Sequence, residues 1–279
     1  MRFHRFDGPG KVKLDEISEE PPENVSKKEA KDRFDEVSEE IFELQDWMWG
    51  ARTHSLLLIL QGRDAAGKDG AVKHMSGGLN PRGVVVTSFG VPTEEEREHD
   101  FLWRVHRHAP RAGRIAVFNR SHYEDVLVAR VRKLVPKEVW KERYDLINAF
   151  ERTLAEANCL LLKFFLHITP KEQEKRLLER ENDPAGAWKL SIDDWKDRDL
   201  WDDYTEAYED AMARCSSPGG PWIVVPANAK WYRDLVIAEA VAHALRPHKG
   251  AWRKTLDEQG KVRRRDLQQW RASRRDASK

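Results

Sequence analysis

A phosphate-binding loop is predicted from Gly62 to Gly70, where the sequence reads Gly-Arg-Asp-Ala-Ala-Gly-Lys-Asp-Gly. Its glycines permit backbone conformations in which successive amides point inward, and Lys68 would neutralise phosphoryl oxygens. An ordinary P-loop has Ser or Thr after the lysine to help hold Mg²⁺, whereas this chain has Asp69. The loop predicts phosphoryl transfer with a different arrangement of metal and phosphate. The alternative is a Gly-rich turn with a solvated lysine.

Two carboxylates, Asp64 and Asp69, lie in or beside this loop. Carboxylates beside a phosphate site repel the ligand unless a cation lies between them or a proton is to be accepted. Mg²⁺ resolves that conflict, so each aspartate is a candidate metal ligand or a base that orients an attacking phosphate oxygen. The alternative is a carboxylate that only stabilises the start of the following helix.

A second polar cluster follows the apolar stretch that ends at Phe118. In P-loop proteins this strand usually ends in a metal-binding Asp, but here the position is Asn119. We expect the metal carboxylate to be displaced to Glu124 or Asp125, and Arg120 to clamp phosphoryl oxygens. The alternative is a helix start in which Ser121 is the cap and Glu124 its partner.

A basic segment near residues 176–200 has the features of a nucleotide-kinase lid, which closes over phosphates and excludes water. The cationic residues expected to act in it are Arg176, Arg180, Lys189 and Arg198. Arg176 and Arg180 are four residues apart and share one face of a helix. Asp193, Asp194, Asp197 and Asp199 lie in the same segment, so the alternative is a solvated helix in which arginines pair with aspartates.

Alternating strands and helices must position these residues. Strands are predicted at 56–60, 84–89, 114–118, 160–166 and 222–225. Helices are predicted at 26–50, from about 70, and at 93–108, 123–132, 136–157, from 170, and 230–245. Strands separated by helices imply crossover connections, and therefore an α/β fold with a mostly parallel sheet between helical layers.

Composition limits the class of protein. The 279 residues are 35% charged and 40% hydrophobic, which indicates an ordinary core beneath a charged surface. No run approaches the roughly 18 apolar residues of a membrane span, the N-terminus lacks the apolar region of a secretory signal, and Cys159 and Cys215 have no motif spacing. We therefore expect a cytoplasmic protein, with one main domain at 1–246.

The C-terminal residues 247–279 are predicted to be a separate basic tail. From Arg246 to Lys279 the chain has twelve Lys or Arg and four Asp or Glu, although its total net charge is only +1. The segment has few aliphatic residues and no long periodic pattern. We expect a flexible, partly disordered end. The alternative is an arm that attracts a polyanion.

Taken together, these blocks resemble the polyphosphate kinase 2 family, whose members phosphorylate nucleotides with inorganic polyphosphate. The resemblance covers about Val12 to Leu245. It rests on the loop at 62–70, on Phe118-Asn-Arg-Ser-His-Tyr-Glu-Asp-Val126, on the lid segment, and on Trp222-Ile-Val-Val-Pro-Ala-Asn228 with Lys230-Trp-Tyr-Arg233. It implies a P-loop kinase-like three-layer α/β/α fold with a helical lid, Mg²⁺ or Mn²⁺ as cofactor, and a homodimer or homotetramer. No membrane or nucleic-acid partner is expected.

The motifs and the resemblance together give expected residue roles, and the resemblance itself implies those of Asp64, Lys68, Arg120, Arg176 and Arg180. Asp64, Lys68, Arg120 and Asp125 are expected to be catalytic, with Asp64 and Asp125 holding the metal. Nucleotide and polyphosphate are expected to contact Gly62, Ala65, Ala66, Gly67, Asp69, Gly70, Asn119, Tyr123, Glu124, Arg176, Arg180, Lys189 and Arg198.

The implied reaction is a reversible in-line transfer to adenine nucleotides, with guanine nucleotides as further candidate acceptors. The Tyr-Glu-Asp sequence at 123–125 looks like the subgroup that phosphorylates both AMP and ADP, because the ADP-specific subgroup typically has Tyr-Asn-Arg. Two alternatives stay open at this point: a nucleoside monophosphate kinase that uses ATP, and a polyanion-binding module without turnover.

Overall fold

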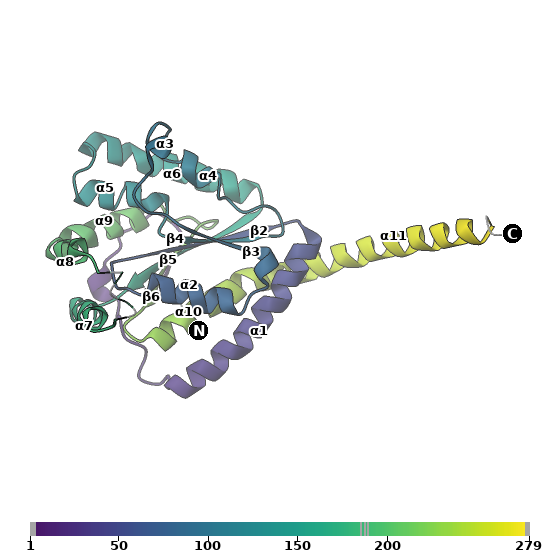
Figure 1. Ribbon diagram of the computed structural model, residues 1–279, viewed down its shortest axis with the longest axis horizontal. Coiled ribbons are helices and arrows are strands. Elements are labelled where there is room, and N and C mark those ends of the chain that lie inside the picture. Colours follow the sequence, from purple (N-terminus) through teal and green to yellow (C-terminus); the bar gives the residue numbers. More distant parts are fainter. Residues whose placement is uncertain (1–3, 185, 187, 189, 277–279) are drawn as a thin grey trace.

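The computed structural model describes residues 4–184, 186, 188 and 190–276, which fold around a twisted six-stranded sheet (Figure 1). The strands are β1 (His4–Phe6), β2 (Ser55–Gly62), β3 (Val84–Ser88), β4 (Ile115–Asn119), β5 (Cys159–His167) and β6 (Trp222–Pro226). Their order across the sheet is β1-β6-β5-β2-β4-β3, and only the β1–β6 pair is antiparallel. The predicted parallel sheet is confirmed, with β1 as an additional edge strand.

Helices cover both faces of this sheet. They are α1 (Lys27–Ala51), α2 (Lys68–Gly77), α3 (Glu94–Arg97), α4 (Trp103–His106), α5 (Val128–Val131), α6 (Lys137–Glu156), α7 (Pro170–Glu181), α8 (Ile192–Asp199), α9 (Trp201–Arg214), α10 (Lys230–Leu245) and α11 (Lys249–Asp276). Helices α1, α2 and α10 pack on one face, and α6 and α9 pack on the other (Figure 1). The three-layer α/β/α architecture predicted from the sequence is therefore confirmed.

Strand β2 shows why a run of consecutive apolar residues forms a strand here. Alternate side chains of a strand point to opposite faces. Leu56, Leu58 and Leu60 pack against α1, α2 and α10, whereas Leu57 and Ile59 pack against the other helical layer. Every residue of β2 is buried, so a polar side chain at any of these positions would lose its solvation. This central strand carries the phosphate-binding loop at its carboxyl end.

Two predicted helices are wrong in extent. The single helix expected at 93–108 is interrupted between α3 and α4, because the Asp100 side chain accepts a hydrogen bond from the Leu102 amide and the chain turns there. The helix expected at 123–132 is replaced by a 3₁₀ turn (His122–Asp125) and the short helix α5. The Ser121 hydroxyl caps that turn through the Tyr123 amide, but Glu124, its partner in the alternative considered, pairs with Arg120 instead. Helix α9 was not predicted.

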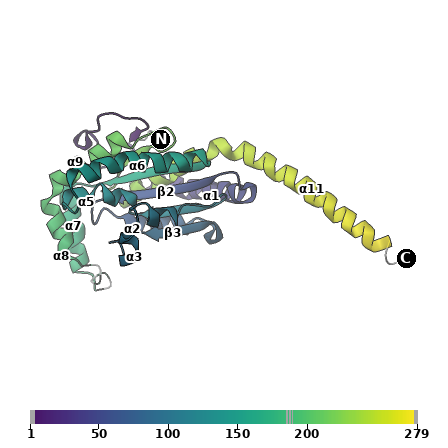
Figure 2. The ribbon, with the colours of Figure 1, turned by 90° about the horizontal axis from the view of Figure 1, so that it is seen from above.

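The C-terminal segment differs from the expected disordered end, because residues 249–276 form the helix α11. This helix leaves the body and extends away from it (Figures 1 and 2). Its first turns are held by Trp252, which is fully buried and donates its indole N–H to His54. The Arg, Lys, Gln and Leu residues beyond are good helix formers, which accounts for helical structure without an apolar stripe. None of the described helices is long and apolar enough to span a membrane.

Candidate active site

The phosphate-binding loop connects β2 to α2 and is shaped by two glycines. Gly62 ends the strand with φ 158°, and Gly67 caps α2 with φ 100° in the left-handed region. A Cβ atom added at Gly67 would lie 2.3 Å from a guanidinium nitrogen of Arg233, so only glycine fits there. The amides at the start of α2 and the positive end of its dipole therefore face the loop, as anion binding requires.

Lys68, the first residue of α2, folds back over the loop. Its Nζ donates hydrogen bonds to the carbonyl oxygens of Gly62 at 2.6 Å and Arg63 at 3.0 Å, and it lies 3.9 Å from an Asp64 oxygen. Burial, with a smaller contribution from the charge of Arg120, lowers the pKa of Lys68 to about 8. A phosphoryl oxygen that enters the loop would meet an ammonium group with little water around it.

Arg120 joins the end of β4 to the loop. Its guanidinium donates to Asp64 at 2.5 Å and to Glu124 at 3.2 Å, and its backbone has a left-handed φ of 62°. A non-glycine residue held in this region is strained, and such residues cluster at functional sites. Burial alone would raise the pKa of the Asp64 carboxyl, but the charges of Lys68 and Arg120 hold that pKa below its usual range. Asp64 is therefore an anion between two cations.

A second contact joins the same two elements. The Asn119 side-chain amide donates to an Asp69 oxygen at 2.8 Å. Asn119 ends β4 and Asp69 is in the first turn of α2, so this bond spans the mouth of the loop. The two departures from an ordinary P-loop protein, Asn at the strand end and Asp after the lysine, are thus partners in one hydrogen bond.

A cleft of about 1150 Å³ opens above the loop, between the carboxyl ends of the strands and the α7–α8 segment. The predicted site residues that line it are Asp64, Ala65, Gly67, Lys68, Asp69, Gly70, Asn119, Arg120, Arg176 and Arg180. A smaller pocket next to it is lined by Gly62, Arg120 and Glu124, among others. Most of the predicted residues therefore converge on one end of the sheet.

The segment expected to form a lid consists of α7, α8 and the residues between them. Arg180 of α7 donates to Asp194 of α8 at 2.7 Å, and both side chains line the cleft. Arg198 instead reaches back to α7, where it donates to the Pro170 carbonyl at 2.6 Å and to Glu174 at 2.8 Å. It is not among the residues that line the cleft. Lys189 lies outside the described residues.

The guanidinium of Arg176 forms its hydrogen bonds with other residues of the protein. A guanidinium has five N–H groups, and here they donate to Glu172 at 2.8 Å and to four carbonyl oxygens. Those carbonyls belong to Ala65 (3.1 Å), Ala66 (2.9 Å), Ala227 (2.7 Å) and Asn228 (2.8 Å). Arg176 therefore ties the phosphate-binding loop to the segment after β6. In this geometry it positions the loop, and Ala66 contributes a carbonyl to that clamp while its side chain is fully buried.

Asp125 and Tyr123, both predicted site residues, face away from the cleft. Asp125 pairs with Arg143 at 3.2 Å and with Arg104 at 3.8 Å. Tyr123 is fully buried and donates to Glu151 at 2.7 Å. The short 3₁₀ turn explains this split, because it points Glu124 toward Arg120 and its two neighbours into the layer of α4 and α6. The structure gives Asp125 no contact with Asp64.

Arg233 is a site residue to which sequence reasoning gave no role. It is buried on α10, donates to the Gly67 carbonyl at 3.0 Å and pairs with Asp234 at 2.6 Å. His74 of α2 also bonds Asp234. The signal in the sequence was an Arg-Asp pair within a mostly apolar helix, where charged residues are rarely buried unless they are paired. Arg233 lines the cleft beside Lys68.

These features define a P-loop kinase-like protein: a parallel α/β sheet, a phosphate-binding loop at the end of its central strand, and a basic helical segment over the cleft. The sequence model of the family described as polyphosphate kinase 2 matches residues 24–251. The chain belongs to the polyphosphate kinase 2 family.

Relatives of known name agree with this assignment. An AMP/ADP-polyphosphate phosphotransferase from Meiothermus ruber is 50% identical over 202 residues, which are 72% of this chain and 76% of the relative. An ADP-polyphosphate phosphotransferase from Rhodopseudomonas palustris is 39% identical over 259 residues, 87% of this chain and 88% of the relative. The crystal structure of polyphosphate kinase 2 from Arthrobacter aurescens superposes with a TM-score of 0.81 at 40% identity, over 84% of this chain and 85% of that one.

Proposed function

We propose that this protein transfers the terminal phosphoryl group of inorganic polyphosphate to AMP and ADP. The observation that carries the proposal is the convergence of Lys68, Arg120 and Asp64 at the mouth of the phosphate-binding loop. The relative from Meiothermus ruber, whose printed name gives both acceptors, supports it. Guanine nucleotides are included among the acceptors to be tested.

When substrate binds, the cations at the loop exchange their hydrogen-bond acceptors in the protein for phosphoryl oxygens. Lys68 moves from the Gly62 and Arg63 carbonyls, and Arg120 from Asp64, to the oxygens of the transferring phosphoryl group. Their positive charges stabilise the charge that spreads over those oxygens in the transition state. Helix α2 supplies further amide donors at the same point. The nucleotide phosphate attacks in line, so no covalent enzyme intermediate is needed.

The cleft fits a divalent cation that is bound together with substrate. Mg²⁺ is usually held by one or two carboxylates together with substrate phosphates and waters. Asp64 and Asp69 both line the cleft, beside the Asn119 amide, whereas Asp125 is engaged elsewhere. Asp64 and Asp69 would therefore hold Mg²⁺ or Mn²⁺, and the bound cation would neutralise charge on the donor phosphates. Asp125, held by Arg143 and Arg104, would not be a ligand.

Within the Tyr-Glu-Asp segment, Glu124 is the residue that would influence which nucleotides accept the phosphoryl group. Glu124 pairs with Arg120, which faces the transferring group, whereas Tyr123 and Asp125 belong to the layer behind it. An acidic residue at this position therefore acts on the acceptor by fixing the direction of the Arg120 guanidinium.

A homodimer or homotetramer is proposed as the assembly, and light scattering on the purified protein measures it.

The Lys68→Ala variant tests the proposed reaction centre. Removing the buried ammonium is expected to lower kcat for transfer from polyphosphate by about 100-fold or more, because electrostatic stabilisation at the loop is lost. Lys73→Ala, which removes an exposed lysine from the same helix, is the matched control and should stay near wild type. Turnover by Lys68→Ala within a few-fold of wild type would exclude this loop as the reaction centre.

A further inference from the structure

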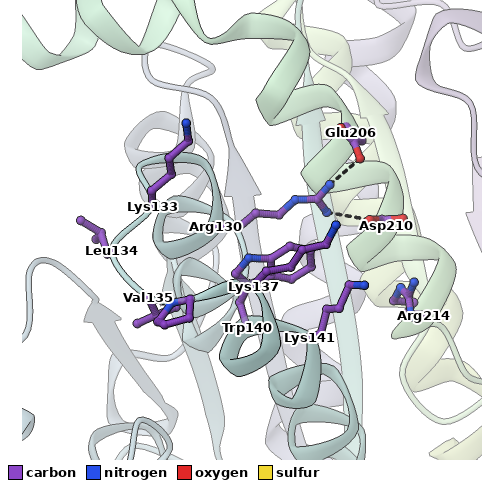
Figure 3. Close-up of a pocket in the computed structure, with 11 residues that line it drawn as sticks. Arg130, Lys133, Leu134, Val135, Lys137, Trp140, Lys141, Glu206, Asp210 and Arg214 are labelled. Atoms are coloured by element: carbon purple, nitrogen blue, oxygen red, sulfur yellow. Dashed lines mark hydrogen bonds and ion pairs between the residues drawn. The ribbon is translucent and has the colours of Figure 1, made fainter.

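A basic pocket lies outside the cleft, between α6 and the α5–α9 pair. Its volume is about 770 Å³. Its lining includes five cationic residues, Arg130, Lys133, Lys137, Lys141 and Arg214, and two carboxylates, Glu206 and Asp210. The side chains of Lys137 and Lys141 extend from α6 into the gap that faces α9, and Arg214 lies across from them (Figure 3). The reaction proposed for the cleft does not use this pocket.

The carboxylates of the pocket are already engaged. Arg130 donates to Glu206 and to Asp210, at 2.6 Å in each case, and its guanidinium stacks over Trp140 at 4.5 Å. Lys133, Lys137 and Lys141 have no ion pair within the described part of the chain. Lys137 and Lys141 are four residues apart on one helix, where like charges repel. The pocket therefore has an excess of positive charge that a bound anion would compensate.

The start of α6 adds to this excess. Its cap residue is Pro136, which offers no side-chain acceptor to the first amides of a helix of 20 residues. Uncapped amides and the helix dipole both favour an anion at this end. Pro136 and Lys137 line the pocket, so the helix start and the lysines face the same space.

The position of the pocket relative to the cleft indicates the ligand. Val128 and Tyr208 line the small pocket beside Arg120, and two residues further along the same helices Arg130 and Asp210 line the basic pocket. The two sites thus lie on opposite sides of the α5–α9 pair, roughly one helix diameter of 10 Å apart. A linear polyanion whose end reacts at Arg120 could continue around this pair, whereas a mononucleotide could not reach both sites.

We propose that the basic pocket binds the distal phosphates of a polyphosphate chain whose terminal phosphate reacts at the loop. This inference rests on the proposed function and assigns a second contact to the same donor. Each phosphate of such a chain carries charge, so its affinity should depend on salt as it does for other linear polyanions. Short donors end within the cleft and do not reach Lys137 and Lys141.

The test compares Lys137→Gln/Lys141→Gln with wild type, and includes Lys137→Glu/Lys141→Glu as the stronger change. For long-chain polyphosphate the Gln variant should raise KM about fivefold, as expected for two exposed charge contacts. The slope of log KM against log salt should become shallower by about 1.4, because two charge contacts are lost. With tripolyphosphate as donor, KM should not change, and kcat and the KM for AMP should also match wild type.

The control is Lys28→Gln/Lys31→Gln, which removes two exposed lysines from α1. An equal rise in KM for this control, or a rise that is the same for long and short donors, would overturn the pocket assignment. Direct binding of long-chain polyphosphate gives a second readout that does not need turnover. Equal affinity of wild type and the Gln variant for polyphosphate would also overturn it. A Gln variant that loses affinity for single-stranded RNA, but not for polyphosphate, would overturn it as well. Wild type that binds polyphosphate but never transfers would instead reject the proposed function.

Discussion

At the scale of single residues, the candidate site is a set of charges that hold one another in place. Asp64 lies between Lys68 and Arg120, and Arg120 in turn pairs with Glu124. The site thus offers a phosphate two cations that are already oriented, at the cost of two existing contacts that must be exchanged. Such preorganised charge is the main source of rate in phosphoryl transfer.

The lowered pKa of Lys68 predicts a pH dependence. Because that pKa falls from 10.5 to about 8 on folding, the cost of burying the ammonium is present in full below pH 8 and disappears as pH rises from about 8 to 10.5. The free enzyme also loses the charge that binds phosphate over this range. We expect kcat/KM for polyphosphate to fall above about pH 8, by about tenfold per pH unit. Lys68→Arg should shift this fall to higher pH, and an unchanged profile would contradict the assignment.

Asp64 and Asp125 should respond differently to the same substitution. Asp64→Asn removes a carboxylate from the cleft, so the Mg²⁺ concentration for half-maximal activity should rise about tenfold or more. Asp125→Asn changes a group that faces Arg104 and Arg143, and its Mg²⁺ dependence should match wild type. Magnesium titrations of both variants check this. A large shift for Asp125→Asn, with none for Asp64→Asn, would reverse the roles proposed here.

At the scale of elements, the loop is positioned by helices that come much later in the chain. Arg176 on α7 and Arg233 on α10 both donate to loop carbonyls, and Gln173 on α7 donates to the carbonyl of Asp64. Helices α7 and α10 therefore hold the backbone of the loop, whereas Arg120 contacts its Asp64 side chain. Movement of α7 would be transmitted to the reacting groups through these bonds.

Arg176→Lys tests the clamp. A lysine has three donors on one nitrogen and cannot replace a five-donor fork, so several buried carbonyls lose their partners. The free energy of unfolding should fall by at least about 3 kcal/mol, and kcat should fall more than KM for polyphosphate rises. Arg198→Lys is the matched control within the same segment, because it bonds at the exposed side of α7. A variant with native stability but a KM raised alone would instead make Arg176 a substrate ligand.

The sequence was sufficient for the five parallel strands, but not for the edge strand β1 or for these long-range bonds. The strand at 56–60, the loop and the helix after it follow from local patterns. An apolar run or a glycine indicates the backbone conformation at its own position in the chain. The carbonyl partners of Arg176 and the role of Arg233 depend on which side chains meet in space, and no spacing within the chain encodes that. The same holds for Asp125, whose pairing with Arg143 draws it away from the cleft.

At the scale of the whole molecule, the basic charge is divided between the body and a projecting helix. Helix α11 extends from the sheet domain (Figure 2). Its beginning packs on the body through Trp252 and through Leu256 beside Gly50. The cleft and the basic pocket both lie in the body. Helix α11 is therefore not expected to take part in the phosphoryl transfer.

Removing residues 259–279 tests that division. The buried Trp252 and the Leu256 contact remain, so the free energy of unfolding should change by less than about 0.5 kcal/mol. The kcat for AMP should be unchanged. Urea unfolding and initial rates measure both quantities. A truncated protein that is folded but inactive would show that α11 takes part in the reaction, either directly or through assembly.

The most direct test of the central claim is a matrix of donors and acceptors, read by chromatography of the nucleotide products. Polyphosphate or ATP is supplied as donor with Mg²⁺, and AMP, ADP, GMP or GDP as acceptor. The account predicts that polyphosphate converts AMP to ADP and then to ATP, and that Lys68→Ala abolishes both steps. Brisk transfer from ATP to AMP, with no nucleotide phosphorylated from polyphosphate, would contradict it.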